Sequence, residues 1–428
     1  MRASSVLAAF GASALAATAV VACAVSESDE QPSRDGGRAE TVPDAGVDDV
    51  EASVDASVGG RVCSAAGWCE TSLPDEHLTL VDVWPLVGHA FAIAESPSLG
   101  VKVLEWSEVE AKWAYIDDST QNEPGSGAYG GKIWAPSENE VYFGVAPAYI
   151  YRGTRSSSPK TAWTWTRERL QDNGQVGDIA DWVHGHTVNG RSLVLGVWGT
   201  SENDVYAWFK NTIYRRRTSG GAPEWLPEHV ADDFDDGAEH LFFLSAAGTK
   251  PGDIWFSGAR SRVSSGCALL VRKTDAGYER IADGTASDSA CTPRAGALMI
   301  GGTEGRLTDL QAVAADHFVA LKGARDAVRI KAVGDSYVID VTSGPGPSVG
   351  VADGEPFTSL WSTAGTVWFT ASGLVVRGTD PWGGGKYEVS TIALMGAPIG
   401  KRVYQVRGTS QSNLWAIGEH FALHKTAP

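Results

Sequence analysis

The fold is decided by the stretch Leu193-Val194-Leu195-Gly196-Val197-Trp198-Gly199-Thr200-Ser201-Glu202-Asn203-Asp204-Val205-Tyr206-Ala207-Trp208. A run rich in β-forming residues reaches Trp198. The Ser-Glu-Asn-Asp that follows supplies turn chemistry, because Asn and Asp tolerate left-handed backbone geometry. A second strand follows over 205–208, a third is predicted over 213–215, and a fourth around Trp225. Four antiparallel strands joined by tight turns are therefore predicted for this unit.

The same unit returns along the chain, and its second strand carries an aromatic residue behind a small or apolar one. Residues 133–142 repeat the first hairpin almost residue for residue, and residues 406–415 give a further copy. The seven landmark aromatics are Phe91, Tyr142, Tyr206, Trp255, Phe318, Trp368 and Trp415. They are separated by 51, 64, 49, 63, 50 and 47 residues, and Phe318 is assigned mainly by this spacing.

A unit that recurs at about 40–50 residues, lengthened only by loop insertions, is typical of a radial β array. The sequence therefore predicts an all-β chain folded as a seven-bladed β-propeller. Six blades is the alternative if the 113 residues from Trp255 to Trp368 do not hold two units. The chain has 16 tryptophans, but an aromatic at the same place in every unit is better explained by packing between blades than by sugar stacking.

The last unit ends in a third strand over 420–425, and the chain stops at Pro428 without a fourth. Residues 67–74, which contain Trp68, lie just before the first strand of the first unit and resemble residues 224–227. We therefore expect this N-terminal segment to supply the missing strand of the last blade. Ring closure of this kind leaves no free sheet edge between the first and last blades.

The N-terminus predicts export. A single positive charge at Arg2 precedes an uncharged, Ala- and Val-rich run, so residues 1–22 are predicted to be a lipoprotein signal peptide with lipidation at Cys23. Ordinary cleavage and full secretion is the alternative. Residues 23–60 carry ten acidic residues and no aromatic residue, which predicts a disordered acidic tether. The β-propeller domain is assigned to residues 61–428, at the outer membrane or cell surface.

Charge and cysteine content restrict the partners and the compartment. The chain has a net charge of −17, and 42 acids face 32 bases outside residues 1–60, which argues against nucleic acid as a partner. The four remaining cysteines form two local pairs, Cys63 with Cys69 and Cys267 with Cys291, and predict two disulfides in an oxidising compartment. We expect a monomer that touches the membrane only through its lipid anchor.

Long connections from one blade to the next point to a working face, because binding residues gather on loops held by a rigid scaffold. These connections are roughly 119–131, 171–192, 230–240, 283–308 and 343–358, and all emerge on one face of the disc. Two clusters on them are candidate binding sites: Asp178, Asp181, Trp182, His184 and His186, and the acidic tip Asp232, Asp233, Asp235 and Asp236. The first cluster has no third metal ligand with diagnostic spacing, so whether it binds a metal is unknown. The second only loosely resembles a calcium loop, and calcium is the one cofactor considered.

No catalytic residue is assigned. Gly346-Pro347-Ser348-Val349-Gly350 fits G-x-S-x-G formally but lacks the helix on which that motif depends, and no Walker A or HExxH sequence occurs. The leading hypothesis is a membrane-tethered extracytoplasmic module that binds a protein or glycan at the cell surface without covalent chemistry. The alternative is a polysaccharide-active hydrolase or lyase, because a propeller can bring distant carboxylates together without a local motif.

The unit V-W-G-T-S-x-N-D-V-Y/W-A, followed by I-Y-R and a tryptophan strand, resembles the repeats of bacterial surface lipoproteins with BNR-like or kelch-like propellers. It is also similar in blade pattern to the photosystem II stability and assembly-factor propellers. The resemblance covers residues 67–428 at the level of the repeat. Sialidase-type Asp boxes are absent, so the resemblance implies no glycosidase residues.

Overall fold

The computed structural model describes residues 62–427, except 126–128, 147–148, 159–160, 171–194, 220, 236, 263–264, 288–289, 302–304, 353 and 395–398. The predicted signal peptide, Cys23 and the acidic tether lie outside the described residues. No helix within the described ranges is long and apolar enough to span a membrane.

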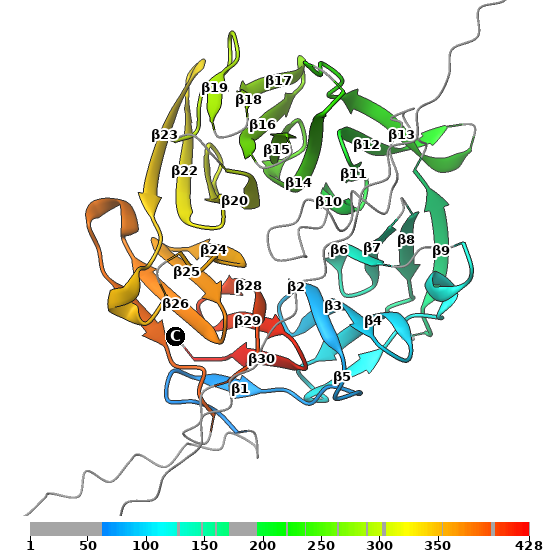
Figure 1. Cartoon of the computed structure of the whole chain (residues 1–428). Coiled ribbons are helices and arrows are strands. Elements are labelled where there is room, and N and C mark those ends of the chain that lie inside the picture. The colour runs from blue at the N-terminus through cyan, green and yellow to red at the C-terminus, as the bar shows by residue number, and fades with distance from the viewer. Residues whose placement is uncertain are drawn as a thin grey trace, which may run out of the picture. The chain divides into compact units, whose positions relative to one another are not determined.

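Seven four-stranded antiparallel sheets are arranged around a ring in the described part of the chain, together with one two-stranded sheet (Figure 1). The innermost strand of each sheet contacts the innermost strand of the next, and the last contacts the first. The prediction of an all-β seven-bladed propeller is confirmed, and the six-bladed alternative is wrong. The weakly marked fifth unit around Phe318 is a complete blade.

The first three blades follow one another in sequence. Blade 1 contains β2 (Thr79–Pro85), β3 (His89–Ser96), β4 (Gly100–Ser107) and β5 (Lys112–Tyr115). Blade 2 contains β6 (Tyr129–Ser137), β7 (Glu140–Ala146), β8 (Tyr149–Thr154) and β9 (Thr164–Arg169). Blade 3 contains β10 (Leu195–Ser201), β11 (Asp204–Phe209), β12 (Thr212–Ser219) and β13 (Ala222–Val230).

Blade 4 contains β14 (Glu239–Lys250), β15 (Asp253–Arg262), β16 (Ser265–Thr274) and β17 (Gly277–Ala282), followed by an inserted hairpin, β18 (Gly284–Ala286) and β19 (Cys291–Pro293). Blade 5 contains β20 (Leu307–Ala314), β21 (His317–Lys322), β22 (Asp326–Val333) and β23 (Ser336–Ser343). Blade 6 contains β24 (Ser359–Thr363), β25 (Thr366–Ala371), β26 (Leu374–Thr379) and β27 (Tyr387–Ser390). Blade 7 contains β28 (Val403–Ser410), β29 (Asn413–Gly418), β30 (Phe421–Lys425) and β1 (Trp68–Glu70). Three short 3-10 turns are η1 (Thr120–Asn122), η3 (Pro347–Val349) and η4 (Pro381–Gly383).

All seven landmark aromatics lie in the second strand of their blade, and none is more than 1% exposed. They pack within and between blades; Trp255, for example, lies 4.5 Å from Phe318 of the next blade, measured between ring centroids. The prediction that these residues form the core is therefore confirmed. Large rings at the wide spaces between blades bury much apolar area, which is what a radial array of twisted sheets requires.

In blades 2, 3 and 4 a polar brace joins an acid two residues before the aromatic to an arginine of the third strand, and blade 7 has asparagine and histidine in these places. In blade 3, Asp204 begins the second strand and accepts a hydrogen bond from Arg215 of the third strand at 2.8 Å. The Arg215 guanidinium also lies 5.4 Å from the Tyr206 ring centroid. Equivalent braces join Glu140, Tyr142 and Arg152 in blade 2, Asp253, Trp255 and Arg272 in blade 4, and Asn413, Trp415 and His424 in blade 7.

The N-terminal strand closes the ring as the sequence predicts. β1 pairs antiparallel with β30, and Trp68 lies opposite Lys425 (Figure 1). Trp68 is fully buried, and its indole nitrogen donates a hydrogen bond to the Ser390 hydroxyl of blade 6 at 2.8 Å. The predicted Cys63–Cys69 disulfide is present and holds this strand, and the Cys267–Cys291 disulfide joins β16 to the inserted hairpin.

Candidate functional site

The candidate residues Asp178, Asp181, Trp182, His184 and His186 fall within 171–194, outside the described residues. Asp236 also lies outside them. The structure places the other three members of the acidic tip, Asp232, Asp233 and Asp235, on the connection between blades 3 and 4.

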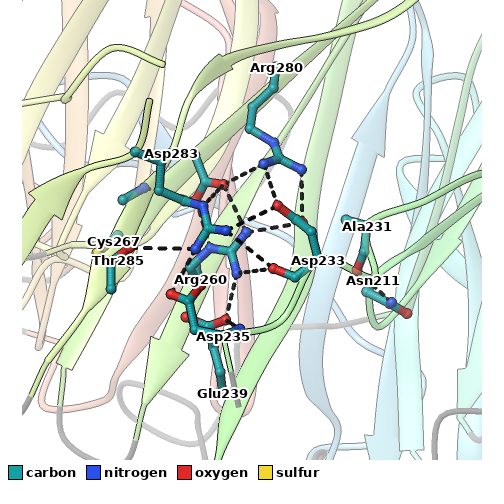
Figure 2. Close-up of polar contacts among 12 residues, drawn as sticks. Asn211, Ala231, Asp233, Asp235, Glu239, Arg260, Cys267, Arg280, Asp283 and Thr285 are labelled. Carbon is teal, nitrogen blue, oxygen red and sulfur yellow. Dashed lines mark hydrogen bonds and ion pairs between the residues drawn. The ribbon is translucent and has the colours of Figure 1, made fainter. Parts of the chain in front are cut away.

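Two members of the acidic tip, Asp233 and Asp235, pair with arginines of blade 4 and of the segment that follows its inserted hairpin (Figure 2). Asp233 pairs with Arg280 at 2.6 Å and with Arg260 at 3.2 Å, and Asp235 pairs with Arg294 at 2.8 Å. Burial acts to raise the pKa of Asp233, but these guanidinium groups outweigh it and lower that pKa. The hydrogen bond from Arg294 likewise lowers the pKa of Asp235.

Arg260 forms the centre of this cluster. Its guanidinium has no exposure to solvent and donates to Asp283 at 2.9 Å and to Glu239 at 2.6 Å, both of which are also fully buried. Two of the four carboxylates considered for calcium, Asp233 and Asp235, thus have arginine partners, and calcium binding stays a prediction. No group of His, Cys, Asp or Glu residues that could hold a metal ion occurs in the described part of the chain.

A second set of residues converges on the central channel. On the innermost strand of each blade, one residue lies directly opposite the landmark aromatic. In four blades this residue is tryptophan: Trp84, Trp134, Trp198 and Trp361. In blade 7 it is Arg407. We call these four tryptophans the collar.

The glycine of the V-W-G-T-S unit is required first by its own hairpin, because a Cβ atom would lie 2.7 Å from the Asp204 carbonyl oxygen in blade 3 and from the Asp253 carbonyl oxygen in blade 4. The collar adds a second restriction. A Cβ atom at Gly199 of blade 3 would lie 2.8 Å from the Trp134 ring of blade 2. A Cβ atom at Gly248 of blade 4 would lie 3.1 Å from the Trp198 ring of blade 3. Each of these tryptophans therefore lies across the next blade, in space that only glycine leaves open.

A cavity of about 330 Å³ opens among these inner strands. Its lining comes from six blades and includes three collar tryptophans and Arg407; the other lining residues are Pro85, Ala246, Leu310, Gln311, Ala312, Val313, Ser362, Thr363, Ala364, Gly408 and Thr409. Carboxylates, histidines and cysteines are missing from this described lining. The arrangement can hold a ligand through apolar edges, hydroxyls and one guanidinium, but it brings no general acid and base together.

The cavity lies on the face opposite the one predicted from loop length. Its lining residues belong to the later parts of the innermost strands, next to the turns that lead into the second strands. The long connections between blades, including the acidic tip, enter at the beginnings of those innermost strands. Loop length therefore pointed to one end of the channel, whereas the described cavity lies at the other.

Four charged residues of the inner strands interact with one another near the cavity: Asp82, Lys132, Asp309 and Arg407. Asp82 is fully buried and accepts hydrogen bonds from the Ile133 amide at 2.8 Å and from the Gln405 side chain. Burial raises the pKa of Asp309, although Lys132 and Arg407 act in the opposite direction. Lys132 has no hydrogen-bond or ion-pair partner among the described residues.

Comparison with solved structures identifies the same architecture elsewhere. YCF48 from Cyanidioschyzon merolae superposes with a TM-score of 0.52 at 13% identity, covering 85% of this chain and 99% of that chain. A structure of YCF48 bound to D1 peptide gives a TM-score of 0.52 at 11% identity, covering 86% and 99%. At these identities the similarity shows the fold alone. No protein-family model and no curated protein sequence matches the chain.

The fold and the cavity together define the class: a seven-bladed propeller closed by its N-terminal strand, with a ligand-sized cavity at one end of its channel. Sequence reasoning did not find the cavity residues, although a signal was present. The tryptophans of V-W-G-T-S, of I-W-A-P-S and of L-W-S-T occupy one position of the repeat, and Arg407 stands there in the last copy.

Proposed function

We propose that the chain is a protein-binding module that receives an extended segment of a partner protein at the cavity end of its channel. The observation that carries this proposal is the lining of the cavity by six blades, so that the site exists only in the closed ring. Rigid sites of this kind bind with little loss of conformational freedom. The bound D1 peptide of the similarly folded YCF48 supports a peptide ligand.

The tryptophans themselves favour a peptide over a stacked sugar. One face of the Trp84 ring is covered by the Arg407 guanidinium, 4.7 Å from the ring centroid. Trp134, Trp198 and Trp361 are 3%, 9% and 6% exposed, so little ring face is open for a sugar. What these residues offer to the cavity is an apolar rim, which suits the side chains of an extended chain.

The proposal is tested by filling the cavity. Thr363 lines the cavity, and its side-chain hydroxyl has no hydrogen-bond partner among the described residues, so Thr363→Trp adds bulk without removing a described side-chain polar contact. We expect this variant of the full chain to lose binding on an array of random nonapeptides that the wild type binds. Leu99→Trp, in the turn between β3 and β4 at the other face, is the matched control and should bind as the wild type does. Unchanged binding by Thr363→Trp would refute the proposed site.

A further inference from the structure

Arg407 is held in place by one corner of its guanidinium. Its Nη1 donates to the Val83 carbonyl at 3.3 Å and lies 3.7 Å from an Asp82 oxygen, while the plane of the group covers Trp84. Its side chain is 14% exposed and lines the cavity. These contacts fix the orientation of the guanidinium.

The opposite edge of the Arg407 guanidinium is without a partner in the part of the chain that the structure describes. Its Nε and Nη2 atoms have no hydrogen-bond partner among the described residues. Two parallel N–H groups on one edge of a guanidinium match the two oxygens of a carboxylate, and this fork is the strongest geometry by which arginine recognises one.

The charge around Arg407 is positive on balance. Asp82 accepts hydrogen bonds from Ile133 and Gln405 and lies 3.7 Å from the Arg407 guanidinium, and burial favours the neutral form of Asp309. Lys132 interacts electrostatically with Asp309 and forms no hydrogen bond or salt bridge in the described ranges. A chain of net charge −17 therefore contains a small positive site at the end of its channel, and low solvent exposure strengthens the attraction of such a site for an anion.

We propose that the Nε–Nη2 edge of Arg407 binds a carboxylate of the partner segment, with Lys132 adding positive potential nearby and the collar contacting the flanking residues. This inference rests on the proposed function and names the chemistry of its ligand: an acidic peptide. The carboxylate comes either from an acidic side chain or from a chain terminus.

The experiment uses the full chain on an array of nonapeptides with random flanks and blocked ends. Half of the array has glutamate at the centre, and half has glutamine in the same flanks; a second copy leaves the C-terminus free. We expect the strongest binding in the glutamate half, and a loss of about tenfold in affinity for Arg407→Gln, about 1.4 kcal/mol. Arg407→Lys keeps the charge without the fork and should lose much of the same affinity. Arg377→Gln, which removes an exposed arginine paired with Glu388, is the control.

The outcomes separate the two proposals. The wild type could bind glutamate and glutamine peptides equally, while Thr363→Trp still blocks binding. That result would overturn the proposed carboxylate site at Arg407 and leave the proposed function standing. The comparison of glutamate with glutamine peptides uses the wild-type chain, so its result stands even if Arg407→Gln is too unstable to measure. A preference confined to peptides with a free C-terminus would identify the terminal carboxylate as the source. Oligogalacturonate, a chain of sugars that carry carboxylates, is the glycan probe. If it binds through Arg407 and peptides do not, the proposed peptide ligand is wrong.

Discussion

Arg260 shows how much a single buried charge contributes to the stability of this molecule. Its guanidinium bridges Glu239 at the start of β14 and Asp283 after β17, and reaches Asp233 on the preceding connection. It therefore joins the entry and exit of blade 4 to the end of blade 3 (Figure 2). Removing one member of a buried ionic network leaves the others uncompensated, which costs far more than losing a pair on the surface.

We expect Arg260→Met to lower the free energy of unfolding by about 3–5 kcal/mol, because it leaves two buried carboxylates without their main cation. The matched control is Arg329→Met, which removes a partly exposed pair with Asp340 and should cost no more than about 1 kcal/mol. Urea unfolding followed by tryptophan fluorescence measures both. Equal stability of the two variants would show that the cluster does not brace the blade.

These contacts also show where reading the sequence reaches its limit. The run of acids from Asp232 to Asp236 stands out in the sequence, but its arginine partners lie 47 and 59 residues further along, at Arg280 and Arg294. No local motif links them. In the sequence, an acidic run with distant partners looks the same as an acidic run with none, so the arginine pairing could not be predicted, and calcium binding stays a prediction.

At the scale of the strand, β1 decides whether the ring is closed. It adds only three residues to blade 7, but it buries Trp68 against Trp368 of blade 6, with the ring centroids 6.1 Å apart. The Thr71 hydroxyl donates to the Ala422 carbonyl at 2.7 Å and accepts a bond from the Trp113 indole of blade 1 at 3.0 Å. The closing segment therefore contacts blades 1, 6 and 7.

Deletion of residues 62–75 should unfold the domain, because it exposes the edge of β30 and removes these contacts from three blades. Circular dichroism melting of the deleted chain measures the effect. Glu70→Ala, which changes an exposed residue of the same strand, should leave the melting temperature close to that of the wild type. A deleted chain that melts with the wild type would contradict closure by this strand.

The strands could be predicted from the sequence because the residues that mark them lie close together in the chain. The turn residues and the landmark aromatic recur within each hairpin, and Trp68 could be matched to Trp225 as a fourth-strand tryptophan. The collar was not recognised, because its position is occupied by tryptophan in four blades and by Arg407 in another. A residue that changes identity from blade to blade is hidden from a search for repeats, although this variation gives the channel its chemistry.

At the scale of the whole molecule, the ring holds its inner strands together with side chains rather than a continuous sheet. The Gln311 side chain of blade 5 donates to Leu360 and accepts from Ser362 of blade 6, at 2.8 and 2.9 Å. The Gln405 side chain of blade 7 accepts from the Val83 amide of blade 1 at 2.7 Å. Such contacts set the width of the channel, and with it the shape of the cavity.

In the proposed function, a partner segment binds at the cavity end of the channel and not at the long connections. Photo-crosslinking with the best-binding array peptide, carrying a benzophenone beside its central residue, tests this directly by mass spectrometry. We expect labels on β24 and β28, close to Thr363 and Arg407. Labels confined to residues 231–238 or 283–306, at the other face, would contradict it.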